Sequence, residues 1–231
     1  MSEALVLLPG MGCSTRLWGD LAGRLDGVPV VHGRLDRPTI DGCVENLLTQ
    51  LPPRFALAGL SLGGIVAMAL VRLAPERVSR LLLASTNARV PTTEQYAAWA
   101  MQRARLAAGA SARELQLDLL PALLHRRTCR LDTQVLAMAE DVGEQDFDAQ
   151  LAAQATRVDE RPTLRHIRVP TQVVAAAQDR LCPLPRHEEI AALVPDARLV
   201  VLRGVGHLSP LEDPLGVASA LRRWLDRPGR G

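Results

Sequence analysis

The sequence predicts an α/β fold, a mostly parallel, doubly wound sheet of about six strands with four inserted helices. Three observations support this prediction. Short aliphatic runs alternate with helix-period segments up to Ser85, a long helical stretch interrupts the alternation, and strands and helices resume near the end of the chain. A length of 231 residues suits one domain that carries an inserted subdomain.

Four strands are expected before the interruption, because unbroken aliphatic runs are typical of strands buried on both faces of a parallel sheet. They are Ala4 to Leu8, Val28 to Val31, Phe55 to Ala58 and Arg80 to Ser85. Helical patterns separate them, through Leu17 to Leu25, through Val44 to Leu48, and from Ser61 to about Leu73. Ala74 and Pro75 end the third helix. This order predicts helices on both faces of the sheet.

The interruption is helical throughout and shows no convincing strand. Its expected helices are 93–108, 112–125, 131–142 and 145–158. We expect residues 91–165 to form a helical lid subdomain over a core of residues 1–90 and 166–231.

Two strands are expected after the insertion, at residues 171–177 and 198–202. A helix over about 185–193 lies between them, and an amphipathic helix with Val217, Leu221 and Trp224 on its apolar face ends the fold. The sheet therefore has about six strands, and the insertion follows the fourth.

The third strand runs into Gly59-Leu60-Ser61-Leu62-Gly63, and a helix follows at once. A residue at such a turn has strained backbone geometry, and glycines two positions away on each side leave room for the chain to reverse. The hydroxyl of Ser61 is then held clear of the sheet. The same five-residue pattern also arises by chance in glycine-rich turns, so the assignment depends on partners elsewhere in the chain.

Candidate partners follow the last two strands. A serine hydroxyl needs an imidazole base, which in turn needs a carboxylate to fix its tautomer. Asp179 follows the fifth strand and His207 the sixth, and the carboxyl ends of parallel strands meet at one edge of a sheet. The alternatives are a turn-capping role for Asp179 before Pro183 and a structural role for His207. Asn87 follows the fourth strand, but it carries no charge and cannot supply the carboxylate. The other histidines, at positions 32, 125, 166 and 187, are expected on the surface or in the lid.

The order serine, acid, histidine, the glycine-flanked serine turn, the loop 178–183 and the segment 204–214 together resemble the α/β-hydrolase family over nearly the whole chain. The resemblance implies an enzyme that hydrolyses an ester-like acyl bond through an acyl-enzyme, without metal or organic cofactor. It implies that Ser61 is the nucleophile, Asp179 the triad acid and His207 the base. The oxyanion hole would come from the backbone N–H groups of Met11 and Leu62.

The sequence departs from the family pattern in three places. Pro9-Gly10 replaces a common His-Gly pair, which removes a histidine that often braces the oxyanion loop. The glycine-rich segment that is common after the second strand is replaced by residues 32–38. The antiparallel strands that usually begin the fold are missing or very short.

The implied substrate is a small molecule, a carboxylic ester, thioester or lactone with a small to medium apolar acyl part. Two alternatives stay open: cleavage of a C–C bond, lyase or cyclase chemistry with His207 as acid and base, and a ligand-binding, receptor-like protein. The larger apolar lid residues favour packing over substrate contact; they are Tyr96, Trp99, Met101, Leu106, Leu120 and Phe147. Lid arginines at positions 103, 105, 126 and 127 could recognise a carboxylate or phosphate, or form a solvated helix face.

Composition narrows the remaining classes. All 27 cationic residues are arginine, which excludes Schiff-base lysine chemistry and a phosphate-loop lysine. A net charge of +2 gives no reason to expect binding to nucleic acid or to an anionic membrane surface.

The four scattered cysteines indicate reduced thiols and no metal site, with Cys13 and Cys182 near the expected pocket as small apolar residues. With no signal peptide and no apolar run long enough to span a membrane, we expect a cytoplasmic protein. The sequence does not predict an oligomeric state.

Overall fold

The computed structural model describes residues 3–25 and 27–228. Met1 and Ser2, on which part of the expectation of no signal peptide rests, lie outside the described residues. Within the described ranges, one sheet contains six strands in the order β2-β1-β3-β4-β5-β6, and all its pairings are parallel. The strands are β1 Ala4–Leu8, β2 Val30–His32, β3 Phe55–Leu60, β4 Val78–Ala84, β5 Thr171–Ala176 and β6 Ala197–Leu202. The α/β prediction is confirmed.

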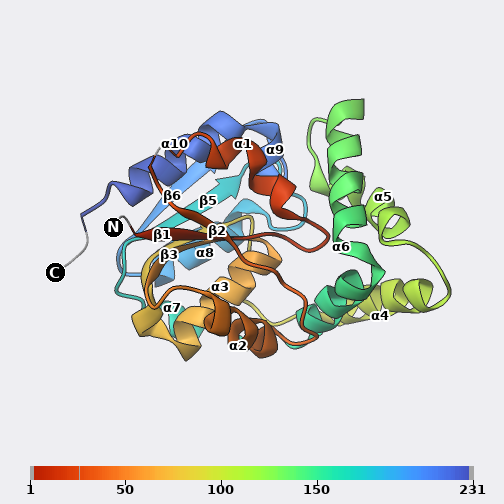
Figure 1. Cartoon of the computed structure of the whole chain (residues 1–231), viewed down its shortest axis with the longest axis horizontal. Coiled ribbons are helices and arrows are strands. Elements are labelled where there is room, and N and C mark those ends of the chain that lie inside the picture. Colours follow the sequence, from red (N-terminus) through yellow and green to blue (C-terminus); the bar gives the residue numbers. More distant parts are fainter. Residues whose placement is uncertain (1–2, 26, 229–231) are drawn as a thin grey trace.

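Helices cover both faces of the sheet (Figure 1). On one face lie α1 Gly19–Ala22, α9 Ser209–Glu212 and α10 Pro214–Leu225, together with the 3-10 turn η1 Thr15–Trp18. On the other lie α2 Ile40–Gln50, α3 Leu62–Leu73, α7 Arg161–Leu164 and α8 Leu184–Leu193, and a second 3-10 turn, η2 Pro75–Arg77, follows α3. Alternation along β1 divides the core: Leu5 and Leu7 pack in the cluster of Trp224, whereas Val6 and Leu8 pack in the cluster of α2 and α3.

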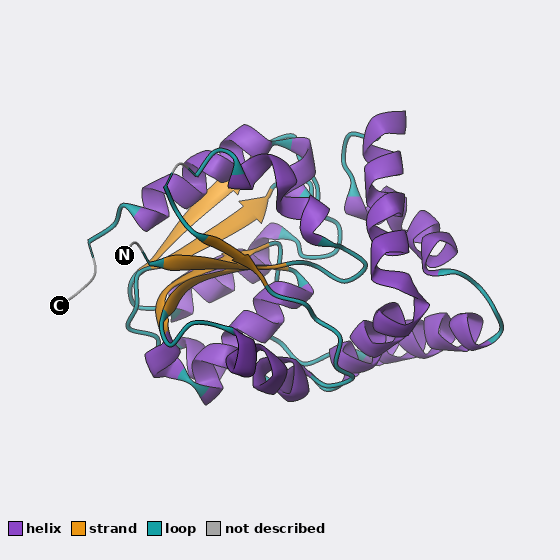
Figure 2. Ribbon diagram, in the orientation of Figure 1, coloured by secondary structure: helices purple, strands orange, loops and turns teal. Residues whose placement is uncertain are grey.

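Three helices between β4 and β5 form the insertion, which lies beyond the carboxyl ends of the strands (Figure 2). They are α4 Thr93–Ala107, α5 Ala112–Leu123 and α6 Cys129–Ala155. Gly143, with φ of 72° and ψ of 170°, breaks α6, so this part of the chain still contains four helical segments. The short helix α7 packs against α3 and α8, on the core. In packing terms, the inserted helices therefore end before α7.

The ends of the observed helices and strands differ from the predicted ends by a few residues. α6 ends at Ala155, three residues before the predicted end at Val158, and the brief helices α7 and α9 carry too few residues to show a period. β2 begins at Val30 rather than Val28. None of the helices in the described ranges combines the length and the apolar character needed to cross a membrane.

Candidate active site

Ser61 lies at the sharp turn between β3 and α3, with φ of 54° and ψ of −114°. Its backbone is fixed on both sides: the amide donates to Ala84 O at 3.0 Å, and the carbonyl accepts from Thr86 Oγ1 at 2.9 Å. The Ser61 side chain forms no capping hydrogen bond with α3, although it occupies the position before the first helical residue. The turn therefore presents the hydroxyl without using it for helix capping.

Asp179 and His207 form a buried pair, 5% and 2% exposed. His207 Nδ1 lies 3.0 Å from Asp179 Oδ1 and 2.9 Å from Oδ2. The Leu181 and Cys182 amides also donate to Oδ1, at 2.9 and 2.8 Å. Burial raises the pKa of Asp179, but the imidazole and these amides outweigh burial, so the pKa lies below its ordinary value. The carboxylate thus caps its turn and holds the imidazole at the same time, and its role as triad acid stays a prediction.

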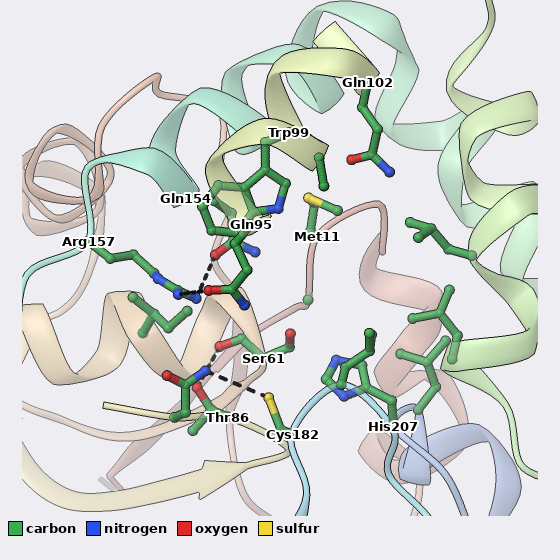
Figure 3. Close-up of a pocket in the computed structure, with 18 residues that line it drawn as sticks. Met11, Ser61, Thr86, Gln95, Trp99, Gln102, Gln154, Arg157, Cys182 and His207 are labelled. Atoms are coloured by element: carbon green, nitrogen blue, oxygen red, sulfur yellow. Dashed lines mark hydrogen bonds between the residues drawn. The ribbon is translucent and has the colours of Figure 1, made fainter. Parts of the chain in front are cut away.

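One cavity of about 240 Å³ is lined by three of the five residues predicted for the site. Ser61, His207 and Met11 line it, and Figure 3 shows Ser61 between His207 on one side and Arg157 on the other. Leu62, the first residue of α3, is fully buried beside Ser61. Asp179 does not line the cavity but lies behind the imidazole.

Apolar surface makes up most of the cavity lining, and polar side chains form the rest. The apolar lining includes Leu119, Leu123, Leu181 and Leu208. The polar lining includes Thr86, Asn87, Gln95, Gln102, Gln154 and Arg157. Amide and guanidinium groups therefore face the same space as the serine hydroxyl. No motif in the sequence singles out the three glutamines or Arg157.

The insertion residues named from the sequence divide between packing and surface. Trp99 lines the cavity, Leu120 and Phe147 are fully buried, and Tyr96 and Met101 are exposed. The named arginines do not line the cavity. Three of them form exposed ion pairs, Arg103 with Asp148, Arg105 with Asp118 and Arg127 with Asp132, and Arg126 Nε donates to Gly204 O. For these four, the solvated-face interpretation fits the structure.

The loop after β1, which contains Met11, is braced by the insertion. Gln150 of α6 accepts from the Gly12 amide at 2.8 Å and donates to Leu35 O at 2.9 Å. A Cβ atom at Gly12 (φ 65°) would lie 2.6 Å from Gln116 Oε1 of α5 and 2.8 Å from Phe147 Cε2 of α6, so the approach of the insertion favours glycine at this positive φ. A buried amide from a distant helix therefore holds the loop that lacks the histidine of the common family pattern.

His187 is fully buried, which corrects the expectation that it lies on the surface or in the lid. It lies on α8, and its Nε2 accepts from the Thr86 amide at 3.2 Å. Burial lowers its pKa to about 4, so the imidazole is neutral near pH 7 and can serve as an acceptor. The other three histidines expected at the surface or in the lid, 32, 125 and 166, are exposed.

Acid should destabilise the protein through His187. Between its ordinary pKa of about 6.5 and about 4, the unfolded chain binds a proton that the folded chain does not, so stability falls as the pH falls. At about 1.4 kcal/mol per pH unit, the free energy of unfolding loses about 3 kcal/mol over this window. Urea unfolding at pH 7 and 4.5 should show a smaller acid loss for His187→Gln than for wild type. The exposed-site control His166→Gln should match wild type, and equal losses in all three proteins would refute the prediction.

The side chains of Asp179, Cys182 and His207 offer ligand atoms within 4.8 Å of one another, the spacing of a metal site. Their chemistry favours another use. The Asp179 carboxylate already bonds His207 Nδ1, and burial raises the pKa of the Cys182 thiol to about 12. A metal would need the thiolate, which burial disfavours. Cys13 is buried with a pKa raised to about 12 by the same cause, so both thiols behave as small apolar groups.

Comparison with known proteins agrees with this architecture. The family model of the alpha/beta hydrolase fold matches residues 8–214. A pimeloyl-[acyl-carrier protein] methyl ester esterase from Aromatoleum aromaticum is 30% identical over 91% of this chain and 93% of its own length. A hydrolase from Pseudomonas aeruginosa shares 27% identity with a TM-score of 0.86 over 97% of this chain and 91% of its own. The enol-lactonase from Burkholderia xenovorans, at 23% identity, shares the fold with a TM-score of 0.85 over 98% and 92%. The chain therefore belongs to the α/β-hydrolase family, and it is a hydrolase.

Proposed function

We propose that the protein is a serine hydrolase that cleaves a carboxylic ester through an acyl-enzyme. The observation that carries the proposal is the common cavity of Ser61 and His207, with the Asp179 carboxylate on the far side of the imidazole. The Aromatoleum relative is named as a methyl ester esterase, which supports an ester over a thioester or a lactone. The four free thiols are compatible with the cytoplasmic location expected from the sequence.

In the proposed reaction, Asp179 holds His207 with the proton on Nδ1, which leaves Nε2 free to accept the Ser61 proton. Ser61 Oγ attacks the carbonyl carbon, and the N–H groups of Met11 and Leu62 stabilise the oxyanion. His207 then donates its proton to the departing alcohol. Water, activated by the same imidazole, attacks the acyl-enzyme and releases the acid. Within residues 91–165, the role of a lid falls in this proposal to α4, α5, α6 and the segment directly after α6, because they supply part of the cavity lining.

A fluorophosphonate probe tests the nucleophile, because only an activated serine reacts with it. We expect labelling of wild-type protein on the peptide that contains Ser61, and none in Ser61→Ala. Ser85→Ala is the matched control, because Ser85 is the other non-glycine residue with positive φ among the described residues, and it should label like wild type. Labelling that persists in Ser61→Ala would refute the nucleophile assignment, and folded wild-type protein that neither labels nor turns over esters would favour the ligand-binding alternative.

A further inference from the structure

Arg157 is a cation inside the candidate active site. It follows the end of α6 and lines the same cavity as Ser61 and His207, although only 7% of the residue is exposed (Figure 3). Its guanidinium lies over the Trp99 ring, 5.2 Å from the centroid. This contact and the surrounding packing fix a planar cation in the cavity wall.

The partners of the guanidinium are neutral. Nη1 donates to Gln154 Oε1 at 3.2 Å, and Nη2 donates to Gln95 Oε1 at 3.1 Å. Nε is buried and has no hydrogen-bond partner. Because a guanidinium carries five N–H donors, these two hydrogen bonds leave donors available to a ligand.

No acidic side chain in the described part of the chain compensates this charge. Burial lowers the pKa of Arg157, and no Asp or Glu is among the groups that oppose this shift. Asp179, the acid next to the cavity, is occupied by His207 and two backbone amides. Buried charges in proteins are normally paired, and guanidinium retains its charge at every ordinary pH. Residues 3–25 and 27–228 therefore supply no pairing anion for this guanidinium.

We propose that Arg157 binds a carboxylate carried by the substrate, so that the preferred substrates are half-esters of dicarboxylic acids. This inference rests on the proposed function, since the ester carbonyl lies at Ser61 while the free carboxylate lies at Arg157. A carboxylate fits better than a phosphate for two reasons. Its planar pair of oxygens matches the planar guanidinium edge, and its single charge balances Arg157, the single arginine among the described residues that line the cavity.

The test compares monomethyl glutarate with dimethyl glutarate, which differ by one neutralising methyl group. For wild type we expect kcat/KM to be about 10- to 100-fold higher for the half-ester, the effect of hydrogen bonds to a charged group. Arg157→Met should lower this ratio at least about tenfold, and Arg157→Lys, which keeps the charge but not the planar fork, should give an intermediate ratio. The control Arg103→Met removes an arginine of α4 that pairs with Asp148 outside the cavity, and the ratio should not change.

Two further measurements keep the inference testable if the Arg157 variants do not fold or if turnover is absent. With wild type, glutarate should inhibit hydrolysis of the dimethyl ester at least about tenfold more strongly than neutral glutaramide. Calorimetry with Ser61→Ala protein should show binding of monomethyl glutarate that the added Arg157→Met substitution weakens by a similar factor.

A wild-type ratio near one, or a ratio unaffected by Arg157→Met, overturns the inference. If the enzyme prefers methyl 4-phosphonobutanoate to monomethyl glutarate, Arg157 binds a phosphate-type anion instead of a carboxylate, and the inference is overturned. Absence of both labelling and hydrolysis defeats the proposed function, whereas the calorimetry still decides the role of Arg157.

Discussion

Replacement of Asp179 by Asn should lower kcat on a short p-nitrophenyl ester by about 10⁴-fold, the loss known for this change in other serine triads. Asn would keep the turn intact, because its Oδ1 can still accept from the Leu181 and Cys182 amides. Its NH₂ group would then face His207 Nδ1, where Oδ2 now lies at 2.9 Å. The imidazole would carry its proton on Nε2 and could no longer accept the proton of Ser61.

Asp179→Asn separates the orientation of the His207 imidazole from the stability of the fold. We expect the melting temperature of Asp179→Asn to stay close to that of wild type while kcat falls. Asp213→Asn is the matched control, because Asp213 caps α10 through the Gly216 amide and Asn is an equally good cap. It should leave kcat unchanged. A loss of less than about tenfold in Asp179→Asn would show that this carboxylate is not the triad acid.

Gly63→Ala should destabilise the fold by more than about 3 kcal/mol or prevent folding. A Cβ atom at Gly63 would collide with Leu8 O and lie 2.6 Å from Pro9 O. These are backbone atoms of β1 and the loop after it, which cannot rotate away. The requirement is for space, because the first turn of α3 approaches the neighbouring strand more closely than a methyl group allows. Chemical denaturation of purified protein, or the soluble yield if none folds, measures the effect.

Gly19→Ala is the control for Gly63→Ala. Gly19 has an ordinary helical φ of −54°, and no atom lies within 4 Å of a Cβ built there. Alanine should stabilise α1 by about 0.5–1 kcal/mol, since it restricts the unfolded chain and favours helix. Equal effects at the two positions would mean that the close approach of α3 and β1 is not required.

The sheet could be predicted because its information is local. Aliphatic runs such as Ala4–Leu8 are typical of strands covered on both faces, and the order of the strands along the chain predicted that Ser61, Asp179 and His207 lie at one edge. The structure brings Ser61 and His207 to one cavity and puts Asp179 behind the imidazole. Their catalytic roles stay predictions.

The polar wall could not be predicted because it depends on contacts between distant segments. Arg157 lies in a stretch whose pattern continues the helix, yet α6 ends at Ala155 and the guanidinium reaches Gln95 on α4, 62 positions away in the chain. His187 stands among polar residues of α8, a pattern typical of an exposed face. Its burial follows from the loop after β4, which supplies the Thr86 amide from 101 positions away.

The hydrogen bonds of Gln150 link the position of the insertion to the conformation of the loop after β1. If the second half of α6 moved away, the Gly12 amide would lose its buried hydrogen-bond partner. The position of the insertion and the conformation of the loop that carries Met11 are therefore energetically coupled. Under the proposed mechanism, a ligand that holds α6 in place would therefore also help to position the Met11 N–H, one of the two proposed oxyanion donors. A substrate too short to reach the insertion would bind without positioning that N–H, and its shortfall would appear in kcat rather than in KM.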